Sequence, residues 1–391
     1  MDFSRRSTWD RRLNRLAAAE KAREAAGREL IDLTSSNPSE CGFRYPAGEL
    51  AAALASAELE TYRPDPKGLL SARRAVASLG FGEAVQIDPE QILLCSGTSD
   101  AYAYLLKLLC EPGDNILVPR PSYPLLDYLA GLEGVTLKPY PLHFAGEWSV
   151  DCGAVREAID ERSRAVVAIN PGNPTGAFLK RAELDALESL CAERGCALLC
   201  DEVFSAYPLA AEGDRVGAVL GQRCPALTFA LSGLSKAAGL PQMKMAWLCA
   251  AGPCGVRDEA MARLELIADT YLASSTVIQS VLPRLLELAP QMRRQIHRRV
   301  RENRERICAA RPGTARWSVL PAEGGWAAIL RLDDECDEEE ICLDLLDHGL
   351  KVQPGYFFDF PRGKFLVLSL IVPPAAMERG LQTLAGVLSV T

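Results

Sequence analysis

Between residues 91 and 250, seven short apolar runs recur, and most are separated by segments with the periodicity of amphipathic helices. The runs are QILLC (91–95), NILV (115–118), VTLK (135–138), AVVAI (165–169), CALLC (196–200), LTFAL (227–231) and AWLCA (246–250). The helical segments include DAYAYLLKLLC, YPLLDYLAGL and AELDALESLCAERG. Apolar strands that alternate with helices form mostly parallel sheets with both faces covered. We therefore predict an α/β fold whose large domain holds a mostly parallel seven-stranded sheet between helices.

The pattern changes after about residue 275. A long helical segment follows, and then WAAILRL and FLVLSLIV, which have the composition of strands, among further helices. This order predicts a smaller α+β domain that the N-terminal segment joins. We expect a large domain over 46–275 and a small domain formed by 1–45 and 276–391, without internal repeats or low-complexity linkers.

The net charge of −8 argues against nucleic acid as a main partner. Two basic runs, RRSTWDRRLNRLAAAEKAREAAGREL and QMRRQIHRRVRENRERICAAR, place arginines between apolar positions at helical spacing. They are most simply the solvated faces of amphipathic helices, with nucleic-acid or membrane binding as the alternative. No stretch approaches the ~20 apolar residues that span a bilayer, and MDFSRRSTWDRRLNRL lacks a signal-peptide core. We expect a cytoplasmic protein without a membrane partner.

Thirteen cysteines, an odd number without a C-x-x-C pair, indicate buried small hydrophobic residues and a few free thiols rather than a disulfide framework. A structural zinc site is not expected, because Cys191, Cys196 and Cys200 fall on a helix end and a strand and the chain has three histidines. We predict no metal.

Ligands of open α/β sheets bind beyond the carboxyl ends of the strands, so the loops that follow the predicted strands are informative. After the first strand, Ser96, Gly97, Thr98 and Ser99 open a helix. Small residues at a helix N-terminus expose backbone N–H groups that suit a phosphate, although an N-cap without a ligand explains the same residues.

Three later loops each carry one polar side chain. The fourth strand ends in NPGNPTG (170–176), a constrained turn that directs Asn173 toward the strand ends, and the fifth runs directly into Asp201. The sixth leads to SGLSK, which ends in Lys236. Taken singly, these are a turn, a capping carboxylate and a surface lysine. Together with the helix start they are the parts that hold pyridoxal 5′-phosphate: a phosphate cradle, an amide, a carboxylate and an imine-forming lysine.

NPGNPTG, DEVF and SGLSK resemble the motifs of the fold-type I pyridoxal-phosphate enzymes, class I/II aminotransferases. The resemblance extends from LTSSNP near residue 33 to the last helix, and the spacings agree: 28 residues from Asn173 to Asp201 and 35 from Asp201 to Lys236. It implies that Lys236 is the catalytic Schiff-base lysine, that Asp201 pairs with the pyridine nitrogen and that Asn173 donates to the ring's 3-oxygen.

The resemblance implies further contacts. Ser96, Gly97, Thr98 and Ser99 correspond to the phosphate loop, and Tyr123 in PRPSYPLL corresponds to the aromatic residue that stacks on the cofactor; without the family it is a packed tyrosine at a helix start. Tyr62 corresponds to a tyrosine that reaches the phosphate in the neighbouring subunit, which implies a homodimer with shared active sites. The segment between Tyr62 and Gly68 is one residue longer than in the family pattern.

Two cofactor-binding positions depart from the family pattern. Phe204 stands where a tyrosine usually donates to the 3-oxygen, so we hypothesise that the holoenzyme titrates at a different pH than its tyrosine-bearing relatives. Lys244, eight residues after Lys236, stands where an arginine usually binds the phosphate. Lysine keeps the positive charge but lacks the planar, two-pronged geometry of arginine, so we expect the phosphate to be bound more weakly.

A third departure concerns the substrate. Val367, two residues before Ser369, stands where the family places the arginine that binds the α-carboxylate. Such a charged hydrogen bond is worth roughly 1.5–3 kcal/mol. We expect Arg362 in DFPRGKF or Arg44 in CGFRYP to substitute, with Ser36 in LTSSNP as a further substrate contact. The alternatives are a substrate that is not held by its α-carboxylate and, for Arg362, an ordinary loop charge.

The leading function is transamination between an amino acid and a 2-oxo acid by a ping-pong mechanism. The main alternative is a carbon–sulfur β-lyase of the same fold. A pyridoxal-phosphate-binding regulator domain is less favoured, because no helix-turn-helix pattern precedes the large domain. A purely structural role would leave Asn173, Asp201 and Lys236 without a use. The sequence does not identify the donor, the acceptor or the pathway.

Overall fold

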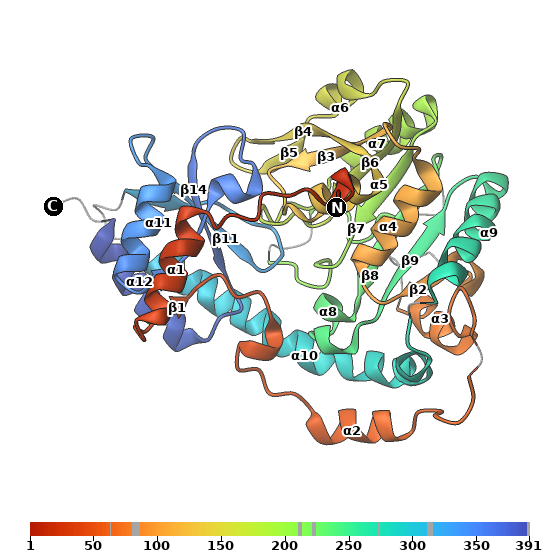
Figure 1. Cartoon of the computed structure of the whole chain (residues 1–391), viewed down its shortest axis with the longest axis horizontal. Coiled ribbons are helices and arrows are strands. Elements are labelled where there is room, and N and C mark those ends of the chain that lie inside the picture. Colours follow the sequence, from red (N-terminus) through yellow and green to blue (C-terminus); the bar gives the residue numbers. More distant parts are fainter. Residues whose placement is uncertain are drawn as a thin grey trace.

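The computed structural model describes residues 1–62, 64–79, 87–209, 213–220, 224–272, 274–310 and 316–388. In these residues the chain forms a large sheet covered by helices and a smaller body built from segments of the N-terminal and C-terminal parts of the chain, with one long helix, α10 (Thr276–Ala309), running along both (Figure 1). The α/β fold class expected from the sequence is confirmed.

The large sheet contains all seven predicted strands. Its described strands follow the order β2-β9-β8-β7-β6-β3-β4-β5. Their bounds are β2 Ile92–Cys95, β3 Asn115–Arg120, β4 Thr136–Phe144, β5 Trp148–Val150, β6 Ser163–Ile169, β7 Ala197–Asp201, β8 Thr228–Gly233 and β9 Ala246–Ala251. The central neighbours from β8 to β4 pair in parallel, whereas β9 runs antiparallel to β8 and β2. The additional strand, β5, forms an antiparallel hairpin with β4.

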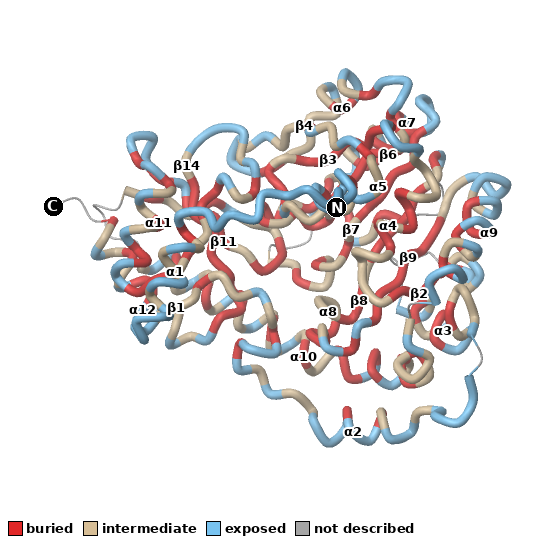
Figure 2. The backbone as a smooth tube through the Cα atoms, viewed as in Figure 1, coloured by how far each residue is buried: buried red, intermediate tan, exposed pale blue. Residues whose placement is uncertain are grey.

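Helices cover both faces of this sheet. The helices around the sheet are α3 Leu70–Ala77, α4 Thr98–Leu109, α5 Leu125–Glu133, α6 Cys152–Ala158, α7 Arg181–Arg194, α8 Leu234–Ala237 and α9 Cys254–Tyr271, whereas α2 Ala47–Ala55 packs against α10. Successive strand residues enter opposite cores: Leu198 and Cys200 belong to one buried cluster and Leu199 to the other. Burial on both faces explains why these strands are apolar without alternation, and the strands are largely buried in Figure 2.

The smaller body holds a four-stranded antiparallel sheet in the order β10-β11-β14-β13. Its elements are α1 Arg15–Ala25, β1 Ile31–Asp32, β10 Trp317–Val319, β11 Ala327–Leu332, α11 Glu338–Asp347, β12 Leu350–Lys351, β13 Gln353–Pro354, β14 Lys364–Ser369 and α12 Pro374–Val387. Strand β1 pairs in parallel with β12, which joins the N-terminal segment to the C-terminal part of the chain.

The long helix α10 spans Thr276–Ala309 and contributes to the cores of both bodies. Its first half supplies Leu285 and Leu288 to the large core, and its second half supplies Ile296 and Val300 to the small one. Several of its arginines, such as Arg298, are exposed, in agreement with a solvated basic face. Because α10 belongs to both cores, the division at residue 275 remains a prediction.

Within the described ranges, no helix combines the length and the apolar content that crossing a membrane requires. All thirteen cysteines are free thiols, as predicted.

Candidate active site

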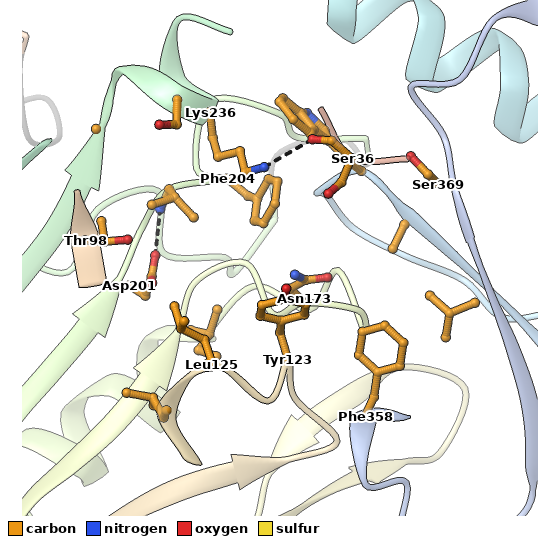
Figure 3. A pocket seen from close by; sticks show the side chains of 18 of the residues that line it. Ser36, Thr98, Tyr123, Leu125, Asn173, Asp201, Phe204, Lys236, Phe358 and Ser369 are labelled. Atoms are coloured by element: carbon orange, nitrogen blue, oxygen red, sulfur yellow. Dashed lines mark hydrogen bonds between the residues drawn. The ribbon is translucent and has the colours of Figure 1, made fainter. Parts of the chain in front are cut away.

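A pocket of about 300 Å³ lies at the carboxyl ends of the parallel strands, where the small body faces the sheet (Figure 3). Four of its lining residues come from the four loops singled out in the sequence: Thr98 at the start of α4, Asn173 after β6, Asp201 at the end of β7 and Lys236 in α8 after β8. Parallel strands end at one edge of a sheet, so residues far apart in sequence meet there.

Lys236 is half-buried, and its amine lies among carbonyl and aromatic groups. Its Nζ donates to the backbone oxygen of Ser36 at 3.3 Å and lies 5.1 Å from the ring centroid of Trp326 and 5.7 Å from that of Phe204. Burial lowers the pKa of Lys236 to about 8. Near neutral pH the neutral form of the amine, which is the nucleophilic form, is therefore more populated than in an ordinary lysine, although the ammonium form still predominates.

Asp201 projects into the pocket from the end of β7. Its Oδ1 accepts from the backbone N–H of Val203 at 3.1 Å, and the hydroxyl of Tyr102 donates to Oδ2 at 3.3 Å. Burial raises the pKa of Asp201 to about 6. A buried carboxylate in this state is stabilised by a cation, so the site suits a positively charged ligand atom.

The start of α4 forms a small polar cradle beside a cation. Gly97 is the N-cap and Thr98 lines the pocket. The Nζ of Lys244 lies 3.9 Å from the position that a Cβ on Gly97 would take. Backbone N–H groups at a helix start together with an ammonium group form a site for a phosphate.

The other members of the predicted phosphate loop lie beside this cradle. Ser96 and Ser99 flank Gly97 and Thr98 and are not among the lining residues. The backbone N–H of Ser96 donates to Asp100 Oδ2 at 3.2 Å, which fixes the approach to α4.

Tyr123 and Asn173 are placed together on the pocket wall. The backbone N–H of Tyr123 donates to the backbone oxygen of Asn173 at 3.0 Å, and both residues line the pocket. Tyr123 is 51% exposed, and its ring centroid lies 6.5 Å from that of Phe358. This geometry leaves one face of an aromatic ring available to a flat ligand, with an amide beside it.

Besides Lys244 and most residues of the phosphate loop, three predicted site residues do not line this pocket. Tyr62 is 69% exposed and borders a second cavity of about 270 Å³. Arg44 and Arg362 are exposed and do not line the pocket, whereas Ser36 does. The shared role of Tyr62 and the substitute arginine therefore stay predictions.

Several lining residues were not foreseen from the sequence. Tyr102 lies one turn after Thr98 on α4, and Ser235 directly precedes Lys236, so helical spacing and adjacency were available signals. Trp326, Gln353 and Phe358 come from the small body, whose strands carry no comparable motif.

The fold and the pocket define a class: a two-body α/β protein in which a reactive lysine, a buried carboxylate and an amide converge at the ends of parallel strands. Residues 28–384 match the family model for aminotransferase class I and II. The chain therefore belongs to the aminotransferase class I and II family, and the predicted family is confirmed.

Relatives of known name include both transferases and a lyase. The alanine aminotransferase of Mycobacterium tuberculosis is 28% identical over 351 residues, 86% of this chain and 80% of that protein. The S-alkyl-thiohydroximate lyase SUR1 of Arabidopsis thaliana is 31% identical over 242 residues, 60% of this chain and 51% of the lyase. The solved structure of an alanine aminotransferase from Pyrococcus furiosus superposes with a TM-score of 0.88 at 21% identity, over 98% of both chains.

Proposed function

We propose that this protein is a transaminase that moves an amino group between an amino acid and a 2-oxo acid, with pyridoxal 5′-phosphate as its cofactor. The observation that carries the proposal is the convergence in one pocket of Lys236, whose pKa is lowered, with the buried Asp201 and with Asn173. Bound pyridoxal phosphate would supply the electron sink that stabilises negative charge on the substrate's α-carbon.

The donor set of the pocket fits this cofactor. The start of α4 and Lys244 suit its phosphate, because they combine backbone N–H groups with a positive charge. Asp201 suits a protonated ring nitrogen, since a buried carboxylate is stabilised by a cation. The amide of Asn173 suits the ring oxygen, and the exposed ring of Tyr123 suits the face of the pyridine.

Lys236 has two tasks in this proposal. Its Nζ holds the cofactor and, after an amino substrate replaces it, removes the proton from the substrate's α-carbon and returns it to a neighbouring carbon. Burial of the amine keeps its pKa low enough for it to act as a base, and the rings of Phe204 and Trp326 lie beside Nζ.

A carbon–sulfur lyase is the second candidate, and one observation favours it. The relative with the higher identity of the two named above is a lyase. The same residues serve both reactions, because each begins with removal of the α-proton; a lyase then expels a β-substituent instead of returning the proton.

The decisive experiment mixes the holoenzyme with individual amino acids and follows the visible absorption of the cofactor. A transaminase shows a change with its donor that a 2-oxo acid reverses, and Lys236→Ala abolishes the change. Release of pyruvate and ammonia from cystathionine without any 2-oxo acid would instead identify the lyase. No spectral change with any amino acid and no such release would overturn both assignments.

The proposal extends to the assembly and location of the protein. A homodimer with shared active sites accounts for the position of Tyr62, which is exposed and does not line the pocket of its own chain. A cytoplasmic location remains a prediction from the sequence.

A further inference from the structure

The pocket contains few charges. Among the described residues that line it, Lys236 is the only one with a cationic side chain and Asp201 the only one with a carboxylate. In the proposed function both groups act on the cofactor. The lining that this chain supplies therefore leaves no charge for the distal end of a substrate.

The wall contributed by the small body is apolar. Val367 on β14 lines the pocket, is 3% exposed and packs in a cluster with Ile329, Phe358 and Phe365. Figure 3 shows Phe358 reaching toward the pocket from the side that also carries Tyr123. The remaining lining residues on this side include Ala327 and Trp326. A charged group placed against this wall would lose its water without gaining a partner.

The uncharged donors of the same region are few but suitable for neutral polar groups. Gln353 pairs in register with Val367 across the sheet and lines the pocket, as does Ser369. The hydroxyl of Ser369 accepts from the backbone N–H of Ile371 at 3.4 Å and leaves its own hydrogen for another acceptor.

Two half-buried arginines around this region are engaged elsewhere. Arg120 pairs with Asp127 at 3.0 Å and with Asp359 at 2.9 Å. Arg299 donates to the backbone oxygens of Cys41 and Val372, each at 3.1 Å. Both guanidinium groups therefore stabilise segments around the pocket, and turning either one into the pocket would break these ion pairs and hydrogen bonds.

We propose that the pocket selects amino donors with uncharged, mainly apolar side chains and rejects donors with a second carboxylate or a side-chain ammonium group. This inference rests on the proposed function and names the substrate class of the same site. It follows from the single cation and single carboxylate of the lining and from the apolar wall around Val367.

Isosteric amino acids test this charge rule directly. Glutamine and glutamate have nearly the same shape, as have leucine, asparagine and aspartate, so their differences report charge. With the holoenzyme, we expect the second-order rate constant of the cofactor's spectral change to be at least about 100-fold greater for glutamine than for glutamate. In the second series, leucine should react fastest, asparagine more slowly and aspartate most slowly. In a further pair, lysine should react more slowly than norleucine.

A binding measurement keeps the inference testable whatever the reaction proves to be. Pentanoate and glutarate differ by one carboxylate, and their dissociation constants are obtained from the perturbation of the holoenzyme spectrum. We expect glutarate to bind at least about tenfold more weakly than pentanoate. Val367→Arg places a cation where relatives bind the α-carboxylate, so it should tighten the binding of both ligands at least about tenfold, whereas Val367→Met, a longer side chain without charge, should tighten neither. The charge rule itself is tested by the ratio of the two dissociation constants in the wild type.

The outcomes separate the two proposals. If no amino acid changes the spectrum, the transaminase proposal fails, and the carboxylate series still tests the charge rule. If glutamate reacts as fast as glutamine, or glutarate binds as tightly as pentanoate, the charge rule is wrong while transamination stands. A neighbouring subunit that contributes a cation to the pocket would produce this second result.

Discussion

The carboxylate of Asp201 is buried at the end of β7, where the backbone N–H of Val203 and the hydroxyl of Tyr102 donate to it. Burial raises its pKa from 3.8 to about 6. Between these values the folded chain binds more protons than the unfolded chain, so stability falls as the pH rises through this window. The proposed cofactor site is therefore destabilising at neutral pH until a cation occupies it.

We expect Asp201→Asn to stabilise the cofactor-free protein at neutral pH. The gain should be on the order of 1–2 kcal/mol near pH 7 and should vanish near pH 4, where the aspartic acid is already protonated. Urea unfolding of the apoprotein at both pH values measures it, with the exposed Asp334→Asn as the matched control. A loss of stability at pH 7 would show that the hydrogen bonds to Asp201 outweigh the burial of its charge.

Substitutions of Lys244 test its proposed contact with the cofactor phosphate. We expect Lys244→Ala to raise the dissociation constant of pyridoxal phosphate by roughly 10- to 100-fold, because it removes a charge-assisted contact. Lys244→Arg should keep or tighten the affinity, since its planar fork binds two oxygens. Absorbance titration of the apoprotein measures these constants. Equal values for Lys244→Ala and the wild type would contradict the role.

Phe204 packs edge-on against Trp326, with ring centroids 5.3 Å apart. In Phe204→Tyr, the added hydroxyl would donate to the ring oxygen of the proposed cofactor and stabilise negative charge on it. We expect the visible absorption of the variant holoenzyme to titrate at a lower pH than that of the wild type. A spectral pH titration that shows no difference would refute the effect of this substitution.

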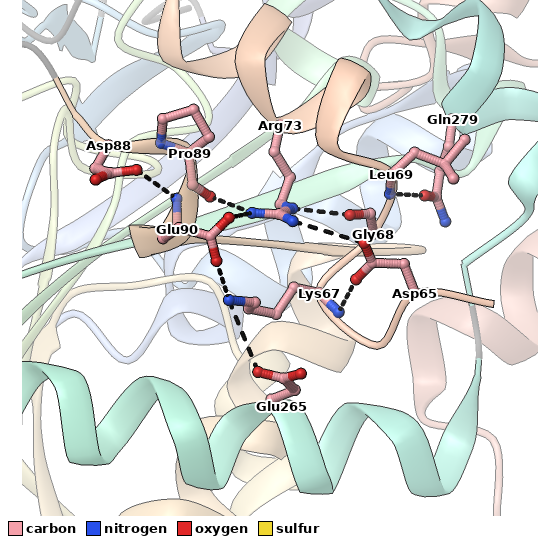
Figure 4. A network of polar contacts seen from close by, with 10 residues as sticks. All are labelled: Asp65, Lys67, Gly68, Leu69, Arg73, Asp88, Pro89, Glu90, Glu265 and Gln279. Carbon is pink, nitrogen blue, oxygen red and sulfur yellow. Dashed lines mark hydrogen bonds and ion pairs between the residues drawn. The ribbon is translucent and has the colours of Figure 1, made fainter. Parts of the chain in front are cut away.

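At the scale of elements, one buried arginine joins three segments (Figure 4). Arg73 on α3 is 4% exposed and donates to the backbone oxygens of Gly68 and Pro89 and to Glu90 Oε1, each at 2.8 Å. The hydrogen bond from Lys67 and that from Arg73 lower the pKa of Glu90 to about 2. This cluster fixes the segment that follows Tyr62 against the start of β2.

We expect Arg73→Met to destabilise the protein by roughly 3–5 kcal/mol, because it leaves buried oxygens without donors. The neighbouring Arg74 is exposed, so Arg74→Met is the matched control and should change stability by less than about 0.5 kcal/mol. Urea unfolding measures both. The part of the stability that depends on ionised Glu90 should be lost as the pH falls from its ordinary pKa toward 2. Equal stabilities of the two variants would contradict the role of the cluster.

Most of the large sheet was predictable from the sequence, because strands buried on both faces are apolar throughout, as in β7. Strand order was not, since β9 inserts antiparallel between β8 and β2 and no local pattern encodes that. The four strand-end loops were recognisable because turns, caps and charges at buried strand ends need particular residues. Gln353 and Phe358 enter the pocket through tertiary packing of the small body, which leaves no periodic signal.

At the scale of the whole molecule, the pocket depends on both bodies. Its lining runs from Thr34 near the N-terminal segment to Ser369 near the C-terminus, and α10 packs in both cores. Tyr62 is the exception, because it lies by a second cavity and is exposed. Its proposed contact with the phosphate therefore requires a second copy of the chain.

Hybrid dimers test this arrangement. In a dimer of one Lys236→Ala chain and one Tyr62→Ala chain, shared sites yield one site with both defects and one site with neither. When equal amounts of the two chains pair at random, half of the dimers are hybrids, so about a quarter of all sites should be intact. These sites are measured by the spectral change that the amino donor produces at limiting cofactor. Each variant alone should show little change under these conditions. If the mixture is no more active than the variants alone, Tyr62 does not act across a subunit boundary, because two unshared sites each keep one defect.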